Sequence, residues 1–236
     1  MIVLSLVLLG ATSCGYKQPV GEMCGNAGAA SFSIPNSEIF MWDKGPGIPP
    51  PPGSSANVFG VILMLRWPGM EPRSGSNNRE FIKTYERSLG STPWLVVGMQ
   101  RSDAEFPRER ISKRLSFYLE TMYAGRGDLE YRDDIHGLRH AVYKSSPGGL
   151  YEDIWFFWGG DKEGVVDHYI KCPNSMPDRP PEKLRSCDNV FYMEEINMRV
   201  LVRYRNDKLI HWREIQDRVR AHLLSKIKDC VAVRSS

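Results

Sequence analysis

The sequence predicts an α+β fold in which an antiparallel β-meander sheet is packed by a C-terminal amphipathic helix. The first observation is a series of strand-sized runs separated by turn residues, a spacing typical of hairpins; they cover residues 138–144, 151–158, 165–172, 190–194 and 198–204. The second is the helical period of residues 208–227, whose apolar residues are Leu209, Trp212, Ile215, Val219, Leu223 and Ile227. We expect this helix to lie across the sheet and bury its apolar stripe, with Asp207 as its N-cap.

The first half of the chain has fewer regular patterns. Residues 38–42 favour a short strand, and residues 44–57, with four consecutive prolines at 49–52, favour a loop. Residues 58–65 and 94–99 are continuous apolar runs, which predict buried strands. Residues 79–89 predict a short amphipathic helix whose apolar face holds Phe81, Ile82, Tyr85 and Leu89. Residues 108–123 fit a helix by their spacing and a strand by their aromatic content, so both interpretations stay open.

Length and charge limit the classes of protein. The chain has 236 residues, with 31 basic and 28 acidic side chains and a net charge of +3. This balance argues against nucleic acid as a partner, because such proteins usually carry a basic stripe. We expect a leader and tether over residues 1–33 and a single α+β domain over residues 34–236, with subdomains 34–135 and 136–236 as the alternative.

The leader is an apolar run over residues 2–9 that meets small residues and then Cys14. The run is too short for a transmembrane helix, which needs about 20 apolar residues, but it has the length of a signal-peptide core. Its ending, Gly10-Ala11-Thr12-Ser13-Cys14, resembles a bacterial lipobox, although a basic segment is missing and Ala11 stands where leucine is usual. The resemblance implies export to the periplasm and a lipid anchor on Cys14. The alternative is a buried N-terminal strand.

The other four cysteines form an even set, which in an exported protein favours disulfides. Three pairings are possible. Their spacing favours Cys172 with Cys187, which bracket a proline-rich loop, and Cys24 with Cys230, which would tie the two ends together. Free buried thiols are the alternative, and no pair has the spacing of a metal site.

No motif for catalysis, a cofactor or a metal is present. The chain lacks Gly-x-Ser-x-Gly, the phosphate-binding glycine motifs and His-Glu-x-x-His, and the pair His136 and His140 lacks the glutamate of the last motif. We therefore favour a binding protein without a cofactor. A rigid loop loses little entropy on binding, so the first candidate contacts are Met176, Arg179 and Arg185 in the loop 173–186, and the second are Asp161 and Lys162 in the turn 159–164. The alternative is that the loop only connects two strands.

The C-terminal third resembles the end of periplasmic immunity lipoproteins that accompany type VI secretion effectors, especially lipases. The resemblance covers roughly residues 138–228 and the leader, and rests on Cys172, Cys187, Phe191-Tyr192-Met193-Glu194, the strand 199–204 and Leu209-x-x-Trp212-Arg213-x-Ile215-x-x-x-Val219. It implies a protein that binds a cognate lipase-type toxin in the periplasm and blocks its active site without catalysis. It implies no contact residues, since such interfaces differ from pair to pair. An exported hydrolase with a dispersed active site and a structural envelope lipoprotein are the competing hypotheses.

Cys14→Ser tests the lipid anchor. Several acyl chains hold a protein stably on a membrane, whereas one chain binds only marginally. The variant should therefore move from the membrane fraction to the soluble periplasm, as followed by immunoblotting of fractionated cells. Unchanged fractionation of the variant would argue against lipidation at Cys14.

Overall fold

The fold is taken from a computed structural model, which describes residues 22–27, 30–43, 56–57, 60–86, 90–101, 107–123, 127–145, 153–160, 165–173 and 185–227. Within these ranges, no helix has the length and apolar character needed to cross a membrane.

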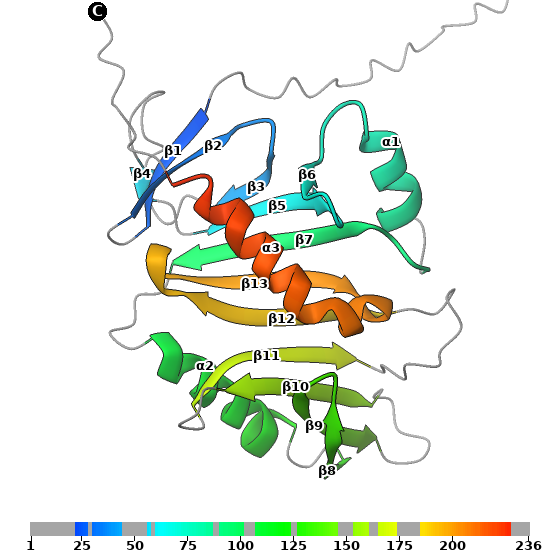
Figure 1. The fold of residues 1–236 in the computed structure, drawn as a ribbon. Helices are drawn as coiled ribbons and strands as arrows, with labels where there is room; N and C mark the ends of the chain where they lie inside the picture. The colour runs from blue at the N-terminus through cyan, green and yellow to red at the C-terminus, as the bar shows by residue number, and fades with distance from the viewer. Residues whose placement is uncertain are drawn as a thin grey trace, which may run out of the picture.

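Most of the described strands belong to one antiparallel sheet (Figure 1). Their order is β3-β5-β7-β13-β12-β11-β10-β9-β8, with β6 paired on β5. The bounds are β3 Ile39–Asp43, β5 Gly60–Arg66, β6 Glu71–Pro72, β7 Trp94–Arg101, β8 Gly127–Ile135, β9 Leu138–Ser145, β10 Ile154–Gly160, β11 Val166–Pro173, β12 Ser186–Met193 and β13 Met198–Arg205. Each strand from β8 to β13 pairs with the next along the chain, so the predicted meander is confirmed.

The sequence pattern does not predict β8, the edge strand of the meander. Its sequence, GDLEYRDDI, has little apolar alternation, and most of its side chains are exposed or half-buried. Backbone pairing with β9 holds it in the sheet. A strand with this composition has no buried face for a periodicity argument to detect.

The C-terminal helix packs across one face of the sheet, as predicted (Figure 1). α3 (Trp212–Leu224) follows a 3-10 turn, η5 (Asn206–His211). Of the predicted stripe, five members are buried with the inward side chains of the sheet, whereas Ile227 is 36% exposed. The prediction that Asp207 caps the helix is wrong, because residues 206–211 wind as a 3-10 turn and α3 begins only at Trp212. The Asp207 carboxylate instead accepts hydrogen bonds from Ser91 and Lys208.

A second, three-stranded sheet holds part of the segment expected to be a tether. It contains β1 (Glu22–Ala27), β2 (Ala30–Pro35) and β4 (Ala56–Asn57). Residues 22–27 and 30–33 therefore form strands, because alternate side chains of β2 are apolar: Phe32 and Ile34 are buried in the main core.

Backbone and charge contacts fix β2 to the end of α3. The Ser33 N–H donates to the carbonyl of Lys226 at 2.8 Å, and the Lys226 ammonium donates to the Glu38 carboxylate at 2.7 Å. Burial acts to raise the pKa of Glu38, but the contacts with His222 and Lys226 outweigh it and hold the pKa below its ordinary value. The N-terminal strands and the last helix thus form one layer on the sheet.

Two shorter helical segments cover parts of the opposite sheet face. α2 (Pro107–Phe117) and its π-helical continuation η2 (Tyr118–Met122) bury Ile111, Leu115 and Leu119 against the meander. Of the two interpretations of residues 108–123, the helix is therefore confirmed. α1 (Asn78–Phe81) and the π-helical η1 (Ile82–Glu86) pack Phe81 on Met64 and Trp94 of β5 and β7.

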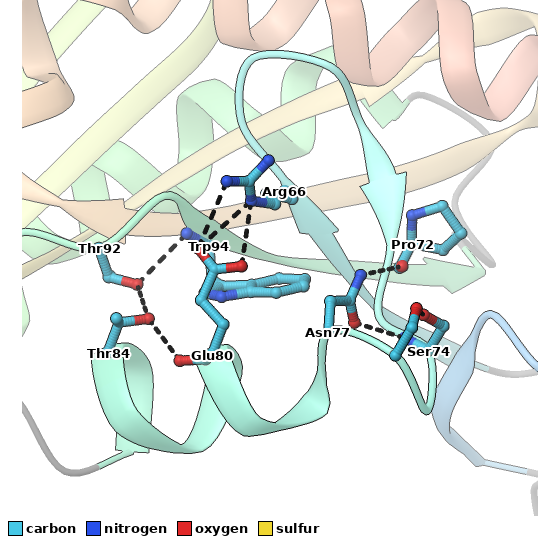
Figure 2. A network of polar contacts seen from close by, with 9 residues as sticks. Arg66, Pro72, Ser74, Asn77, Glu80, Thr84, Thr92 and Trp94 are labelled. Atoms are coloured by element: carbon cyan, nitrogen blue, oxygen red, sulfur yellow. Dashed lines mark hydrogen bonds and ion pairs between the residues drawn. The ribbon is translucent and has the colours of Figure 1, made fainter.

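Polar contacts seat α1 on the sheet edge (Figure 2). Arg66 at the end of β5 pairs with Glu80 at 3.3 Å. The Asn77 side chain accepts from the Ser74 N–H at 2.7 Å and donates to the Pro72 carbonyl at 3.1 Å. The Asn77 contacts hold the start of α1, and the Arg66–Glu80 pair holds the helix itself. Together they fix the position of α1 beside β7.

The predicted disulfide between Cys172 and Cys187 is confirmed. Both residues are fully buried, and they join the end of β11 to the start of β12. The side chain of Cys24 and all of Cys230 lie outside the described residues, so their pairing stays a prediction.

Trp212→Ala should lower the free energy of unfolding by roughly 3–5 kcal/mol, as large aromatic truncations in cores do. Trp212 is 5% exposed, and its indole N–H donates to the His136 carbonyl at 3.1 Å. Urea unfolding followed by circular dichroism gives the value. Ile210→Ala is the matched control, since Ile210 is 61% exposed in the adjacent turn. Equal stability of the two variants would show that the indole contributes nothing to the core.

Replacing both disulfide cysteines by serine should lower stability by about 3 kcal/mol on the chain-entropy model, for a sequence separation of 15 residues. The expected shift is a lower urea midpoint for the double variant than for the oxidised wild type. The reduced wild type is the control. If oxidised and reduced wild type unfold at the same midpoint, the bond does not stabilise the fold.

Candidate functional site

A hollow of about 450 Å³ opens beside the β10–β11 hairpin. We call it the hairpin pocket. The β8–β9 hairpin, the facing ends of β10 and β11, and the first turns of α3 supply its lining: Asp134, Gly137, Arg139, Trp158, Gly159, Gly160, Val166, Asp167, His168, Trp212, Arg213, Gln216 and Asp217.

Backbone geometry shapes this pocket at two points. His136 and Gly137 turn the β8–β9 hairpin with φ values of 55° and 75°, and the His136 carbonyl accepts the Trp212 indole N–H. Gly159 lies against the ring of His168, so closely that a Cβ on Gly159 would stand 2.3 Å from the ring Cε1. Glycine is therefore needed at position 159 while the ring keeps its place.

His168 is the residue in the pocket that most resembles a catalytic base. Its Nδ1 lies 2.5 Å from the Asp167 carboxylate, the arrangement that orients a general base. Its ring stacks on Trp212 at 4.5 Å between centroids and is 5% exposed. The other nitrogen, Nε2, is buried without a hydrogen-bond partner among the described residues. Gly159 and Trp212 lie against the ring, and Nε2 is therefore not exposed to the pocket within the described residues.

The rim of the pocket is charged with both signs. Asp134 and Asp217 are exposed, as are Arg139 and Arg213. The Arg213 guanidinium lies 4.9 Å from the centroid of a Trp212 ring. A rim with both acidic and basic side chains can bind polar groups. It does not select for a ligand of one charge, because neither sign predominates.

Of the predicted contact residues, the structure describes only Arg185, so the contact surface stays a prediction. Asp161, Lys162, Met176 and Arg179 lie outside the described residues, as does Cys14. Arg185 is described and half-buried, and its carbonyl accepts the Asn206 N–H at 2.8 Å.

The histidine pair considered for a metal is not on a helix. His136 lies in a turn, and His140 lies in β9, stacked on Trp155 and Phe157 with centroids 5.6 and 5.5 Å away. Burial and then the charge of Arg132 lower the pKa of His140. No group of three or more His, Cys, Asp or Glu side chains in the described ranges could hold a metal ion.

Sequence reasoning missed a set of basic residues on the sheet face opposite α3. In β13, Met198, Val200, Val202 and Tyr204 are buried under α3, so Arg199, Leu201 and Arg203 face the other way. The alternation of arginine and leucine at every second position of this strand was the available signal. It indicates a strand whose second face is not covered by apolar core.

No family model and no curated protein matches the chain. Among solved structures it is similar to Smlt3025, described as an immunity protein of the Stenotrophomonas maltophilia type IV secretion system, with a TM-score of 0.58 and 18% sequence identity. The match covers 88% of this chain and 94% of Smlt3025. At this identity the similarity shows that the two chains share a fold.

Proposed function

We propose that this protein is an immunity protein that binds a cognate secreted toxin and blocks it by occlusion. The observation that carries the proposal is the fold shared with an immunity protein over 88% of this chain and 94% of the other. The resemblance of the C-terminal third to immunity lipoproteins supports the same conclusion from different evidence.

The candidate site supports binding rather than hydrolysis. Asp167 and His168 are arranged like a catalytic pair, but the Nε2 atom of His168 is buried and not accessible to a substrate. At the hairpin pocket, the exported-hydrolase hypothesis therefore lacks an exposed histidine that could act as the base. Occlusion requires only a stable surface, and the long antiparallel sheet supplies one.

The periplasm is the compartment that we propose. The buried bond between Cys172 and Cys187 supports it, because disulfides persist in oxidising compartments. A lipid anchor on Cys14 belongs to the same proposal and would hold the protein at a bacterial membrane, where an incoming toxin acts.

The class of toxin is a finer part of the proposal. The sequence resemblance favours a lipase-type effector of a type VI secretion system, whereas Smlt3025 is described as belonging to a type IV system. A protective protein must bind tightly in either case; nanomolar affinity corresponds to about −12 kcal/mol. The genes beside this one would identify the secretion system. The lipids that the toxin releases from membranes would identify the reaction that the toxin catalyses.

Co-expression tests the function. The effector encoded next to this gene is directed to the periplasm with and without this protein, and surviving cells are counted. We expect survival only when the protein is present, and an end to fatty acid release from the membrane if the toxin is a lipase. An inactive effector variant is the control for expression toxicity. Equal killing in both strains, with both proteins folded and exported, would return the enzyme hypothesis to first place.

A further inference from the structure

The sheet face opposite α3 carries a groove between α1 and α2. Its apolar part is a hollow of about 330 Å³ over β5, β7 and β13. A smaller hollow beside α2 shares Arg199 and Leu201 with it, so the two form one continuous surface. We call it the basic groove. The described part of the chain leaves it open to solvent.

One register row forms the floor of the groove. Ile62 pairs with Gly98, Gly98 with Leu201, and Leu201 with Val190. Side chains in such a row point to the same face of the sheet. The row is therefore apolar from β5 to β12, with one missing side chain at Gly98.

Gly98 makes the hollow. A Cβ at this position would meet only the Leu201 carbonyl oxygen, at 3.8 Å, which is an ordinary contact. Neither crowding nor the backbone conformation thus requires glycine here. Glycine inside a strand weakens it and often marks a place where another group approaches closely. Gly98 therefore leaves space in the hollow for a side chain of a binding partner.

The end of the groove beside α2 is cationic. Arg114, Lys171 and Arg199 line it, and none of the three has a carboxylate partner among the described residues. Their contacts are neutral: the Arg114 guanidinium donates to the Tyr118 hydroxyl at 3.4 Å, and the Lys171 ammonium lies 5.4 Å from the Tyr118 ring centroid. Arg199 donates to the Gln100 side chain. Arg203 differs, because it pairs with Asp188 at 2.7 Å. Asp188 also lines the cationic end and lies opposite Lys171 in the register of β11 and β12.

The like charges are close enough to affect one another. Burial, and then the charge of Arg114, lower the pKa of Arg199. A carboxylate placed between these two guanidinium groups would remove that repulsion. The groove therefore combines an apolar hollow with three cations that form no ion pair within the described residues, although Asp188, the partner of Arg203, also lines the cationic end.

We propose that the basic groove is the docking surface for the cognate toxin, and that it receives an acidic segment of that toxin. An apolar side chain of the segment fills the hollow above Gly98, and its carboxylates contact Arg114, Lys171 and Arg199. The proposal rests on the proposed function. Its basis is charge complementarity: Arg and Tyr are enriched among the residues that dominate interface energies, and opposite charges steer association.

Filling the hollow is the first test. Gly98→Phe should weaken binding of the neighbouring effector by about 10-fold or more, because the ring occupies the space of the incoming side chain. Phenylalanine has a higher strand propensity than glycine, so the substitution should not destabilise β7. Gly75→Phe is the matched control, since a Cβ on Gly75 meets nothing within 4 Å and the residue lies in an exposed turn. Affinities are measured by calorimetry, and the melting temperatures of both variants show that they fold.

Reversing charge is the second test. Arg199→Glu should also weaken binding by about 10-fold or more, and it should flatten the decrease of affinity with added salt. Arg213→Glu makes the same charge change at the hairpin pocket, on the α3 side of the sheet, and should leave affinity within about 2-fold of the wild type. The reverse result, loss with Arg213→Glu only, would assign the toxin to the hairpin pocket and overturn the proposal.

The outcomes separate this proposal from the function on which it rests. If the wild type protects cells and binds the effector, but Gly98→Phe and Arg199→Glu bind equally well, the groove is not the docking surface and the immunity function stands. If the wild type neither binds nor protects, the immunity function fails and the docking proposal fails with it. A wild-type dimer that Gly98→Phe converts to a monomer would assign the groove to a second copy of this chain, against the proposal.

Discussion

The pairing of β7 with β13 is the interaction on which the rest of the structure depends. Six consecutive residue pairs, from Met198 with Arg101 to Arg203 with Val96, join strands about one hundred positions apart in the sequence. Without them, β3, β5 and β7 would be separated from the meander, and the core under α3 would be cut in two. The same pairs place Gly98 beside Leu201, so the floor of the basic groove also exists only because these strands meet.

The two faces of the sheet have different roles as a result. One face is covered by α3 and β2, and its side chains form the largest apolar cluster. The other face is covered by α1 over β5 and β7 and by α2 over β11 and β12, which leaves parts of β5, β7 and β13 open between them. Alternation along β13 produces this difference, because successive side chains point to opposite faces. A single strand can therefore stabilise the core with Val200 and Val202 while it places the half-buried Arg199 and the exposed Arg203 on the opposite face.

Much of the fold could be predicted from the sequence, because its signals are local or periodic. The stripe of the last helix and the hairpins after residue 138 depend on spacing, and the structure reproduces both. β8 was missed because its charged residues carry no period, and β1 because small residues such as those of GNA look like a linker. The pairing of β7 with β13 gives no local signal at all.

The candidate surfaces were less predictable for a related reason. The sequence favours a proline-rich and a glycine-rich loop as binding regions, but of their candidate contact residues the structure describes only Arg185. The basic groove combines residues from β5, β7, β11, β13 and α2, which only the folded chain brings together. Gly98 is an example. In the sequence it is one glycine in an apolar run, and its place in the floor of the groove depends on the strands that pair with β7 on both sides.

The charged edge strand β8 affects how the protein behaves at high concentration. A free sheet edge is a template on which another chain can add a strand, the first step of many aggregates. Here the edge carries Glu130, Arg132, Asp133 and Asp134, and its register shifts between Arg132 and Ile135. An added strand would have to bury these charges and follow the irregular backbone. The edge therefore opposes the assembly of copies of this chain through their sheets.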